Sequence, residues 1–592
     1  METSTDHHLH GSVHTAKRPR KPLLDKLFAR IGALRPSDRF LILTAAGALF
    51  VTVLWSVLVV DARMSGPISA EAGTLVEGVV GTPRFVNPVL AVTHADRDLD
   101  ALIYAGIARL NEDGEVVPDI AETITVSDDG LIYNVVLRSD VVFHDGEPLT
   151  AEDVAFTISR VQDPALGSPL RASWDGVKVE VLGEHELNFI LQSAYAPFIE
   201  NLTIGILPKH IWQDASNEEF PFSQYNSEPI GAGPYKVDRV TRDESGIPKS
   251  YTLVPHTEYH RDKAKVQTIV LDFFTNESKL IEAFNLGTVE SVAGLSPEAI
   301  AKLDLSDNTH TIVTTPLPRT FAVFFNQNKS AALLDEAARN ALTVAIDRAD
   351  LVNTVLGGYA VPLSSPIPPG FGIEPHEEHE LSASPLDTAR TILRDGGWEV
   401  NEETGIWEKE IDDVVTPLAF SISTANAPVF EATAEYLANT WNTLGASVGI
   451  KQFEQSDLTQ AIIRPRDYEA LLFGTDLGRA LDFYSFWHSS QRNDPGLNVS
   501  LYANITTDSI LEKARTSQDR SDRAQAFKLF ESELEKETPA VFLYSPLFTY
   551  VLPKSITGAG FTGLAEPYER FSGVNDWFME VESVWPIFQH TN

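Results

Sequence analysis

The sequence predicts an α/β fold of more than one lobe, preceded by a single membrane-spanning helix. Three observations support this prediction. Residues 40–60 contain no charged side chain. From residue 74 onward, runs with the alternation typical of strands recur between segments with helical periodicity and capping residues. This mixed pattern continues for more than 500 residues, which is too long for one hydrophobic core.

The uncharged run at 40–60, FLILTAAGALFVTVLWSVLVV, is long enough to cross a membrane as one helix. At ~1.5 Å per residue it spans a hydrocarbon core of ~30 Å. Eight Lys and Arg residues precede it and Asp61 follows it. The positive-inside rule therefore predicts a disordered, basic cytoplasmic tail at 1–39, an anchor at 40–60, a linker at 61–73 and an exported domain at 74–592.

A cleaved secretory signal is the alternative interpretation of this segment. Signal peptides have an apolar region of ~7–15 residues behind a short leader, and Ala70-Glu71-Ala72 would suit cleavage. The longer leader and apolar run favour an uncleaved anchor, and the flanking positive charge disfavours a buried soluble helix. The sequence has no cysteine, which excludes a lipid-modified cysteine and disulfide bonds. The exported part must therefore rely on its hydrophobic core.

The net charge of −37 indicates which partners to exclude. Because phosphate contacts need Lys and Arg, this excess of acidic over basic residues argues against nucleic-acid binding. The simplest interpretation of the acidic charge is solubility. The alternative is that the charge attracts a cationic or amine-bearing ligand.

Strands and helices are predicted in alternation along the exported part. The predicted strands are 74–80, 131–137, 177–182, 186–191, 250–254, 266–273, 320–325 and 418–423. Thr150 and Asp335 are expected to begin two helices as N-caps. The segments 427–444 and 510–536 are expected to be long amphipathic helices.

The stretch at 117–157, VPDIAETITVSDDGLIYNVVLRSDVVFHDGEPLTAEDVAFT, carries a more specific signal. DDG forms a turn between strands, the strand after it alternates, and DGEP forms a second turn that leads to the helix cap at Thr150. In this order the pieces resemble the signature of the dipeptide/oligopeptide-binding family of extracellular solute-binding proteins, bacterial family 5, which supply ABC importers.

Further stretches resemble that family in the same order, from about residue 74 to 590. They are GAGPY at 231–235, AFNLGTVE at 283–290 (with Glu290 in place of the usual Asp), TFAVFFN at 320–326, the helix at 338–348, the loop at 357–369 and FWHS at 486–489. The resemblance implies a periplasmic-binding-protein-like (Venus flytrap) α/β fold with an extra subdomain. The expected parts are lobe I (74–116, 233–318 and 545–592), the subdomain (117–232) and lobe II (319–544).

The resemblance also implies a function. We expect a monomeric solute-binding protein, anchored in the cell membrane by a single helix, with its exported domain on the periplasmic or extracellular side. It would capture di- or oligopeptides between closing lobes and deliver them to an ABC transporter permease, with no cofactor. An enzyme is disfavoured because H-E-x-x-H, P-loop and cysteine-nucleophile motifs are absent from the sequence. The alternatives are a sensor that signals through the helix, a structural or chaperone-like protein, and a binder of a non-peptide solute such as a nickel chelate or an oligosaccharide.

Family members use an aspartate to pair with the α-amino group of the peptide, and the matching stretch here is FGTDLGRALD. The resemblance implies Asp476 as the first candidate for this role and Asp482 as the second. Either aspartate could instead cap a helix or turn, or pair with Arg479. Gly474 and Thr475 would offer backbone groups to the ligand, or simply end a strand.

Other candidates follow from the same resemblance. Trp487 could form a pocket wall or pack in the core. Asn326 could contact ligand from the hinge or cap a turn. The loop 92–98 and Tyr104 are expected near the cleft, where His94 is either a ligand contact or a surface histidine.

Overall fold

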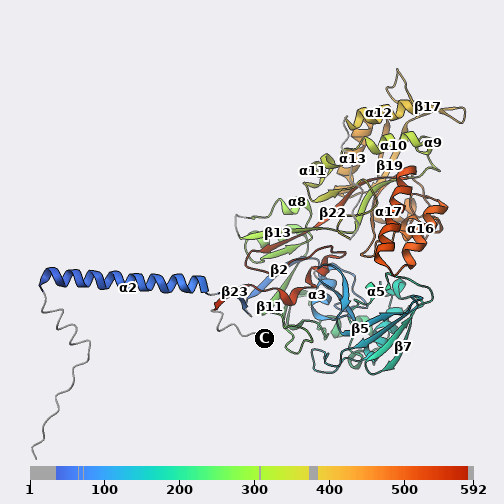
Figure 1. Cartoon of the computed structure of the whole chain (residues 1–592). Coiled ribbons are helices and arrows are strands. Elements are labelled where there is room, and N and C mark those ends of the chain that lie inside the picture. Colours follow the sequence, from blue (N-terminus) through green and yellow to red (C-terminus); the bar gives the residue numbers. More distant parts are fainter. Residues whose placement is uncertain are drawn as a thin grey trace, which may run out of the picture. The chain divides into compact units, whose positions relative to one another are not determined.

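The chain divides into two units, residues 1–68 with 581–592 and residues 69–580. The computed structural model describes residues 35–64, 66–70, 73–111, 113–305, 309–371 and 384–584. The large unit is a mixed α/β structure, as predicted (Figure 1). Residues 1–34 of the predicted tail lie outside the described part of the chain.

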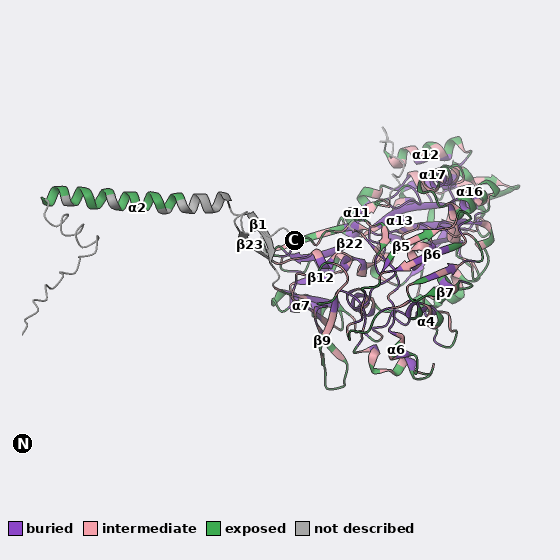
Figure 2. Cartoon of the chain, turned by 60° about the horizontal axis from the view of Figure 1, so that its bottom comes forward, coloured by how far each residue is buried: buried purple, intermediate pink, exposed green. Residues whose placement is uncertain are grey.

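Helix α2 (Pro36–Met64) contains the whole uncharged run. Its stretch Pro36–Val53 is long and apolar enough to cross a membrane, and none of that stretch is buried within the protein (Figure 2). A signal sequence would meet the same criteria. The helix continues to residue 64, and β1 (Gly66–Ala70) then pairs with β23 (Glu580–Val584), so part of the expected linker is helix and strand.

In the described residues, twelve strands form one mixed sheet in the large unit. The main path is β20 (Ser447–Phe453), β19 (Ala419–Ala425), β21 (Ala470–Asp476), β14 (Arg319–Phe325), β22 (Ala540–Pro553), β12 (Ser291–Ala293), β2 (Thr74–Val80), β11 (Thr268–Phe274), β10 (Pro248–Pro255) and β9 (Tyr235–Arg242). β13 (His310–Pro316) and β15 (Ala360–Pro362) also pair with β22. β2 is parallel to β11 and β12, whereas β14 is antiparallel to β21 and β22.

The long strand β22 passes from one half of this sheet to the other. Its first half pairs with β14 and β15, and its second half with β12 and β13. The change of partner falls at Pro546, whose carbonyl accepts from the N–H of Leu317 at 3.1 Å. Ser545 Oγ donates to the Leu317 carbonyl at 2.8 Å. The crossings from β13 to β14 and through β22 therefore lie side by side, as a pair of connections between the two halves.

The residues expected as lobe I and the subdomain share one apolar core. The subdomain residues contribute a second sheet, in the order β5 (Ala121–Val126), β6 (Ile132–Leu137), β8 (Glu186–Ile190) and β7 (Lys178–Gly183). A separate pair joins β3 (Ala108–Leu110) to β4 (Val116–Pro118). The core extends from this sheet to β9–β11 and to Trp577 near the C-terminus. The predicted cap at Thr150 is confirmed, because Asp153 accepts from its N–H at 2.9 Å to begin α4.

Helices cover both lobes. Those associated with lobe I and the subdomain are α3 (His94–Ile103), α4 (Ala151–Gln162), α5 (Phe198–Asn201), α6 (Lys209–Trp212), α7 (Glu277–Asn285) and α8 (Pro297–Ile300). Those of lobe II are α9 (Ala331–Leu334), α10 (Glu336–Val344), α11 (Arg348–Leu356), α12 (Pro385–Asp395), α13 (Pro428–Leu444), α14 (Gln455–Asp457), α15 (Tyr484–Trp487), α16 (Ile505–Thr516) and α17 (Arg520–Glu537). Lobe II also contains a small sheet of β16 (Glu399–Val400), β17 (Trp407–Ile411) and β18 (Val414–Pro417).

The prediction of one helix over 510–536 is wrong. Two helices, α16 and α17, lie side by side there (Figure 1). The break falls at Ser517–Asp519, because the Asp519 side chain accepts from the N–H of Ser521 and Asp522 as the N-cap of α17. The predicted cap at Asp335 is confirmed, since its carboxylate accepts from Ala338 N–H at 3.0 Å.

A fully buried group of charges ties the C-terminal segment to lobe I. Arg570 donates to Glu77 on β2 at 2.6 Å and to Asp98 on α3 at 2.7 Å. The Tyr550 hydroxyl on β22 donates to the same Glu77 carboxylate at 2.5 Å. Burial raises the pKa of Glu77 and outweighs the opposite effect of Arg570. This cluster positions the 3₁₀-helix Pro567–Phe571, which contributes to the site described next.

Candidate functional site

A cavity of about 380 Å³ lies among the residues expected as lobe I and the subdomain. Its volume is in the lower part of the ~300–1,000 Å³ range typical of small-molecule sites. All of its lining residues fall within 88–261 or 566–575, so none comes from lobe II. The cavity is therefore bounded by α3 and the chain after it, by the segments 170–174 and 200–205, and by the C-terminal 3₁₀-helix.

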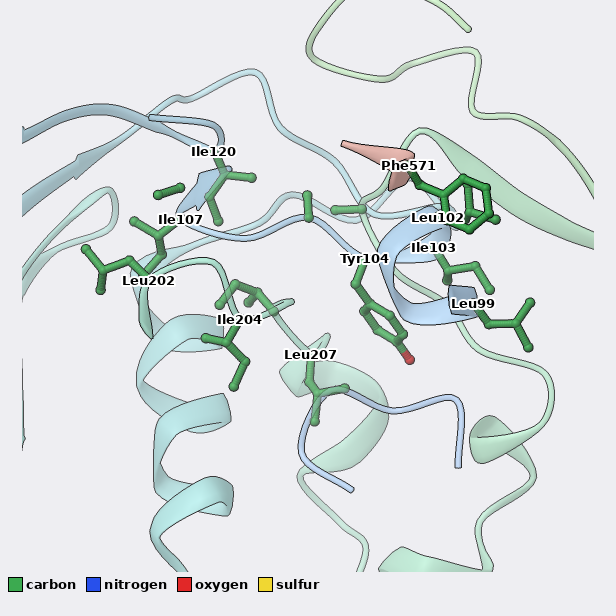
Figure 3. Close-up of a cluster of buried hydrophobic side chains, with 14 of the residues drawn as sticks. Leu99, Leu102, Ile103, Tyr104, Ile107, Ile120, Leu202, Ile204, Leu207 and Phe571 are labelled. Atoms are coloured by element: carbon green, nitrogen blue, oxygen red, sulfur yellow. The ribbon is translucent and has the colours of Figure 1, made fainter. Parts of the chain in front are cut away.

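The apolar wall of the cavity is part of the lobe I core. Figure 3 shows the end of α3, the segment after it and residues 202–207 forming one cluster with Phe571. Tyr104, Ile204 and Phe571 belong both to this cluster and to the lining. The Tyr104 hydroxyl donates to the Val86 carbonyl at 3.3 Å. Glycine at 205 allows the close approach, since a Cβ there would lie 2.6 Å from Tyr104 Cβ.

One part of the lining is rich in carboxylates. Asp100, Glu200, Glu566 and Glu569 all contribute to it. Within the described structure, Oδ1 of Asp100 is buried without a hydrogen-bond partner. Burial raises the pKa of Asp100 well above its usual value, and nearby Asp96 adds to the effect. Burial likewise raises the pKa of Glu200 to about 7 and the pKa of Glu569.

Another part of the lining carries guanidinium groups. Arg109 and Arg261 lie there with Asp119 and Tyr259. Arg109 Nε is 3.9 Å from Asp119 Oδ1 and has no hydrogen-bond partner in the described part of the chain. Asp119 is engaged with His260, at 3.1 Å from its Nε2. Burial and the like charge of Arg261 lower the pKa of Arg109.

Lobe II reaches this region through Arg479. Its guanidinium donates to the carbonyls of Gly114 at 2.8 Å and Gly563 at 2.9 Å. It also forms an ion pair with the buried carboxylate of Glu569, a lining residue. Arg479 therefore connects the stretch 474–482 to the wall of the cavity.

Two further arginines of lobe II make contacts with the subdomain and with lobe I. Arg515 pairs with Asp482 at 3.2 Å and lies over the Tyr195 ring at 5.1 Å from its centroid. Its carbonyl accepts from Ala196 N–H at 3.1 Å. Arg520 pairs with Glu115 at 2.5 Å. The structure thus shows lobe II in contact with both lobe I and the subdomain.

The structure places Asp476 at the end of β21, where it pairs with Arg319 Nε at 2.8 Å. Asp476 is 44 % exposed and does not line the cavity. The same guanidinium lies 3.7 Å from Glu566, which does line it and which also pairs with Arg97 at 3.5 Å. One arginine thus links the predicted amine anchor to the cavity wall.

The neighbours of Asp476 are strand residues. Thr475 is buried and its hydroxyl donates to the Thr320 carbonyl at 3.3 Å. Gly474 faces the Phe321 ring, from which a Cβ would be 3.0 Å away. Both therefore contact β14 in this structure.

The remaining candidates lie apart from the cavity. Trp487 is buried in the lobe II core against Phe324 and neighbouring aromatic rings. Asn326 is buried, accepts from Asn328 N–H at 3.1 Å and donates to the Arg466 carbonyl. His94 is exposed in the first turn of α3.

Asp482 accepts from Ser485 Oγ at 3.0 Å just before α15. The ligand-binding roles of the seven residues chosen from the sequence stay predictions. Tyr104 and Arg97, from the region expected near the cleft, do line the cavity. Sequence reasoning missed Asp100, Glu200 and Arg109, because no motif marks them and only the fold brings them together.

Comparison with known proteins agrees with this architecture. Residues 115–495 match the family of bacterial extracellular solute-binding proteins, family 5 Middle. The chain is 24 % identical to the oligopeptide-binding protein AppA of Bacillus subtilis, over 88 % of this chain and 94 % of that protein.

Solved structures show the same fold. AppA from Bacillus subtilis in complex with a nonapeptide has a TM-score of 0.63 at 24 % identity, covering 87 % of this chain and all of that one. NikZ from Campylobacter jejuni in complex with Ni(L-His) has a TM-score of 0.64 at 24 % identity, covering 86 % of this chain and all of that one. The family match extends over more than half of the sequence, and the chain belongs to the bacterial extracellular solute-binding proteins of family 5.

Proposed function

We propose that this protein captures peptides between its two lobes and delivers them to an ABC transporter permease. The observation that carries the proposal is the cavity in lobe I and the subdomain, which combines carboxylates, guanidinium groups and aromatic rings and whose lining residue Glu569 pairs with Arg479 of lobe II. A peptide presents an ammonium group, a carboxylate and apolar side chains, so its chemistry is complementary to such a lining. The peptide-binding relative AppA supports the same ligand class.

The mechanism is capture and closure, without bond-breaking. The paired crossings at Leu317 and Pro546 supply the hinge, and Arg479 supplies a contact that exists only when the lobes meet. A ligand shifts the equilibrium toward the closed form only by its higher affinity for that form. The permease would then recognise the closed form.

Titration calorimetry on the full chain in detergent would test the ligand class. Pools of dipeptides to octapeptides are expected to bind, with maltotriose and nickel–histidine as controls. Binding of a control alone would assign a non-peptide ligand, which NikZ makes a concrete alternative. Binding of none would contradict the proposal.

We further propose that residues 40–60 anchor the protein, with the basic tail in the cytoplasm and the solute-binding domain outside. The length and composition of α2 support this. Carbonate extraction of membranes, with mass spectrometry of the mature N-terminus, would test it. A soluble protein that begins near residue 73 would instead show a cleaved signal.

The proposed delivery of peptides to a permease is tested by a transport assay. Cells that express the protein should take up labelled peptide faster than cells that lack it, and ATP depletion should abolish the difference. Equal uptake in both strains, from a protein that binds peptide, would separate binding from transport and favour a sensor.

A further inference from the structure

Glu200 is a carboxylate that lies where the subdomain meets lobe II. It belongs to α5 and lines the cavity. Three other elements face it. The segment after β21 contributes Arg479 and the backbone N–H of Ala480, α17 contributes Arg523, and the 3₁₀-helix at 567–571 contributes Glu569. Both arginines belong to lobe II, so the charges around Glu200 depend on the contact between the lobes.

The two arginines are engaged elsewhere. Arg479 donates to two lobe I carbonyls and pairs with Glu569. Arg523 donates to the Ser517 carbonyl at 3.1 Å. Among the described residues, no side chain donates a hydrogen bond to Glu200. The contact between the lobes therefore holds two neighbouring carboxylates, and only Glu569 has an arginine paired with it.

This environment favours a proton on Glu200. Burial raises its pKa to about 7, outweighing the opposite effect of Arg479, and the like charge of Glu569 adds to the rise. Burial also raises the pKa of Tyr195, which faces Glu200, to about 12, so this phenol stays neutral at ordinary pH. If the lobes part, water reaches the Glu200 carboxylate and its pKa returns toward the ordinary value of 4.5. Closing the lobes therefore takes up a proton.

We propose that Glu200 makes the contact between the lobes sensitive to pH, because it holds a proton while the lobes are together and releases it when they part. The proposal rests on the closing motion of the proposed function, and it does not depend on which ligand binds. In an acidic medium the contact persists without a ligand. Near neutral pH the lobes separate more readily, which opens the space between them to a solute.

The sign and the size of the effect follow from the two pKa values. A group whose pKa is raised in the closed form stabilises that form fully below its open-state pKa, and this stabilisation is lost as pH rises through the closed-state pKa. For pKa values of 7 and 4.5, the open population should rise by at most about 70-fold between pH 5 and 8 and level off above pH 7. Because Glu200 is half-buried and faces the cavity, water screens its charge, and we expect a rise of about tenfold.

Hydrogen exchange at Ala196, measured by mass spectrometry on the full chain in detergent, reports the open population without a ligand. The amide of Ala196 lies just before α5 and donates to the Arg515 carbonyl across the contact. After correction for the chemical exchange rate, its protection factor should fall about tenfold from pH 5 to pH 8. Amides of α13, in the lobe II core, are the internal reference, because they exchange only when lobe II itself unfolds.

Three variants separate Glu200 from the other charges of the contact. Glu200→Gln keeps the size of the side chain and imitates the protonated carboxyl group, so protection at Ala196 should be high and independent of pH. Glu115→Gln is the matched control. Glu115 pairs with Arg520 across the same contact at 2.5 Å, and this arginine lowers its pKa, so its removal should weaken the contact equally from pH 5 to 8. Arg479→Ala should lower the protection and shows whether Ala196 reports the opening.

The outcomes separate this inference from the proposed function. A pH dependence that disappears in Glu200→Gln and persists in Glu115→Gln supports the inference. A pH dependence that is the same in Glu200→Gln and the unaltered protein overturns it, as does protection that rises with pH. Protection that is unchanged by pH but lowered in Arg479→Ala overturns the inference and leaves the closing motion standing. Protection that changes neither with pH nor in Arg479→Ala overturns both, because the lobes then do not part.

Discussion

Arg479 is the side chain whose removal tests the contact between the lobes most directly. Arg479→Ala deletes two hydrogen bonds to carbonyls of lobe I and the ion pair with Glu569. The side chains of both ionic partners are at most 11 % exposed. The variant leaves the Glu569 carboxylate buried with only backbone donors, at Ala565 and Glu566.

The magnitude follows from those contacts. Removing one partner of a fully buried ion pair costs about 3–5 kcal/mol. The two backbone donors remain, and the raised pKa of Glu569 allows it to take up a proton, which lowers the cost. We therefore expect the closed contact to lose about 2–3 kcal/mol. At 1.36 kcal/mol per factor of ten, this is an increase of roughly 30- to 150-fold in the open population.

Hydrogen exchange measured by mass spectrometry reports this population. The amide of Ala196 donates across the lobes to the Arg515 carbonyl, so peptides that contain Ala196 should exchange faster in Arg479→Ala, by up to that factor. Peptides from the helix α13, in the lobe II core, should be unchanged.

Arg464→Ala is the matched control. Arg464 pairs with Asp494 at 3.7 Å, and both side chains are more than half exposed. Such surface pairs contribute ~0–1 kcal/mol, so exchange should change less than about fivefold. If exchange at Ala196 is no faster in Arg479→Ala than in Arg464→Ala, Arg479 does not hold the lobes together.

Three further changes have effects that the structure predicts. Arg570→Met should lower the free energy of unfolding by about 3–5 kcal/mol in urea, because Glu77 and Asp98 keep buried carboxylates without their partner. Trp487→Ala should cost about 3–5 kcal/mol by the same assay, because it leaves a cavity in the lobe II core. The pKa of Glu200 is about 7 in the folded protein, whereas an unperturbed glutamate has a pKa of 4.5. The stability that this group contributes is therefore fully present below pH 4.5 and is lost as pH rises through 7. Stability should therefore fall by at most about 3 kcal/mol between pH 5 and 8, and Glu200→Gln should remove that part.

Each of these has its control. Arg390→Met breaks an exposed pair with Asp387 and should cost less than about 1 kcal/mol. Trp487→Phe should recover most of the loss, because a ring still fills the space. Glu402→Gln changes an exposed carboxylate and should leave the pH profile as it is. An equal loss of unfolding free energy in Arg570→Met and Arg390→Met would contradict the role given to the buried charges. A Trp487→Phe variant no more stable than Trp487→Ala would contradict the cavity argument. A fall in stability with pH that is the same in Glu200→Gln and the unaltered protein would contradict the role given to Glu200.

Much of the architecture could be predicted from the sequence, because it depends on local patterns. The eight predicted strands were located to within two residues, as at β2, whose predicted and observed bounds coincide, whereas other strands, including β21 and β22, were not predicted. Side-chain caps at Thr150 and Asp335 act within three residues of themselves, so they could be recognised without a fold. The break between α16 and α17 was missed because a long amphipathic pattern outweighed the single cap at Asp519.

Which residues form the candidate site could not be predicted from the sequence, because only the tertiary structure brings them together. Asp100 and Glu569 are separated by more than 400 residues, and only β22 and the buried Arg570 cluster bring their segments together. Whether an aspartate is free or engaged depends equally on distant partners, as Arg319 and Asp476 show. The sequence by itself determined the class of fold, the apolar helix and the family, since these rest on periodicity, length and ordered motifs. The tertiary structure decided which charges face one cavity, because burial and pairing are properties of long-range contacts that no local pattern encodes.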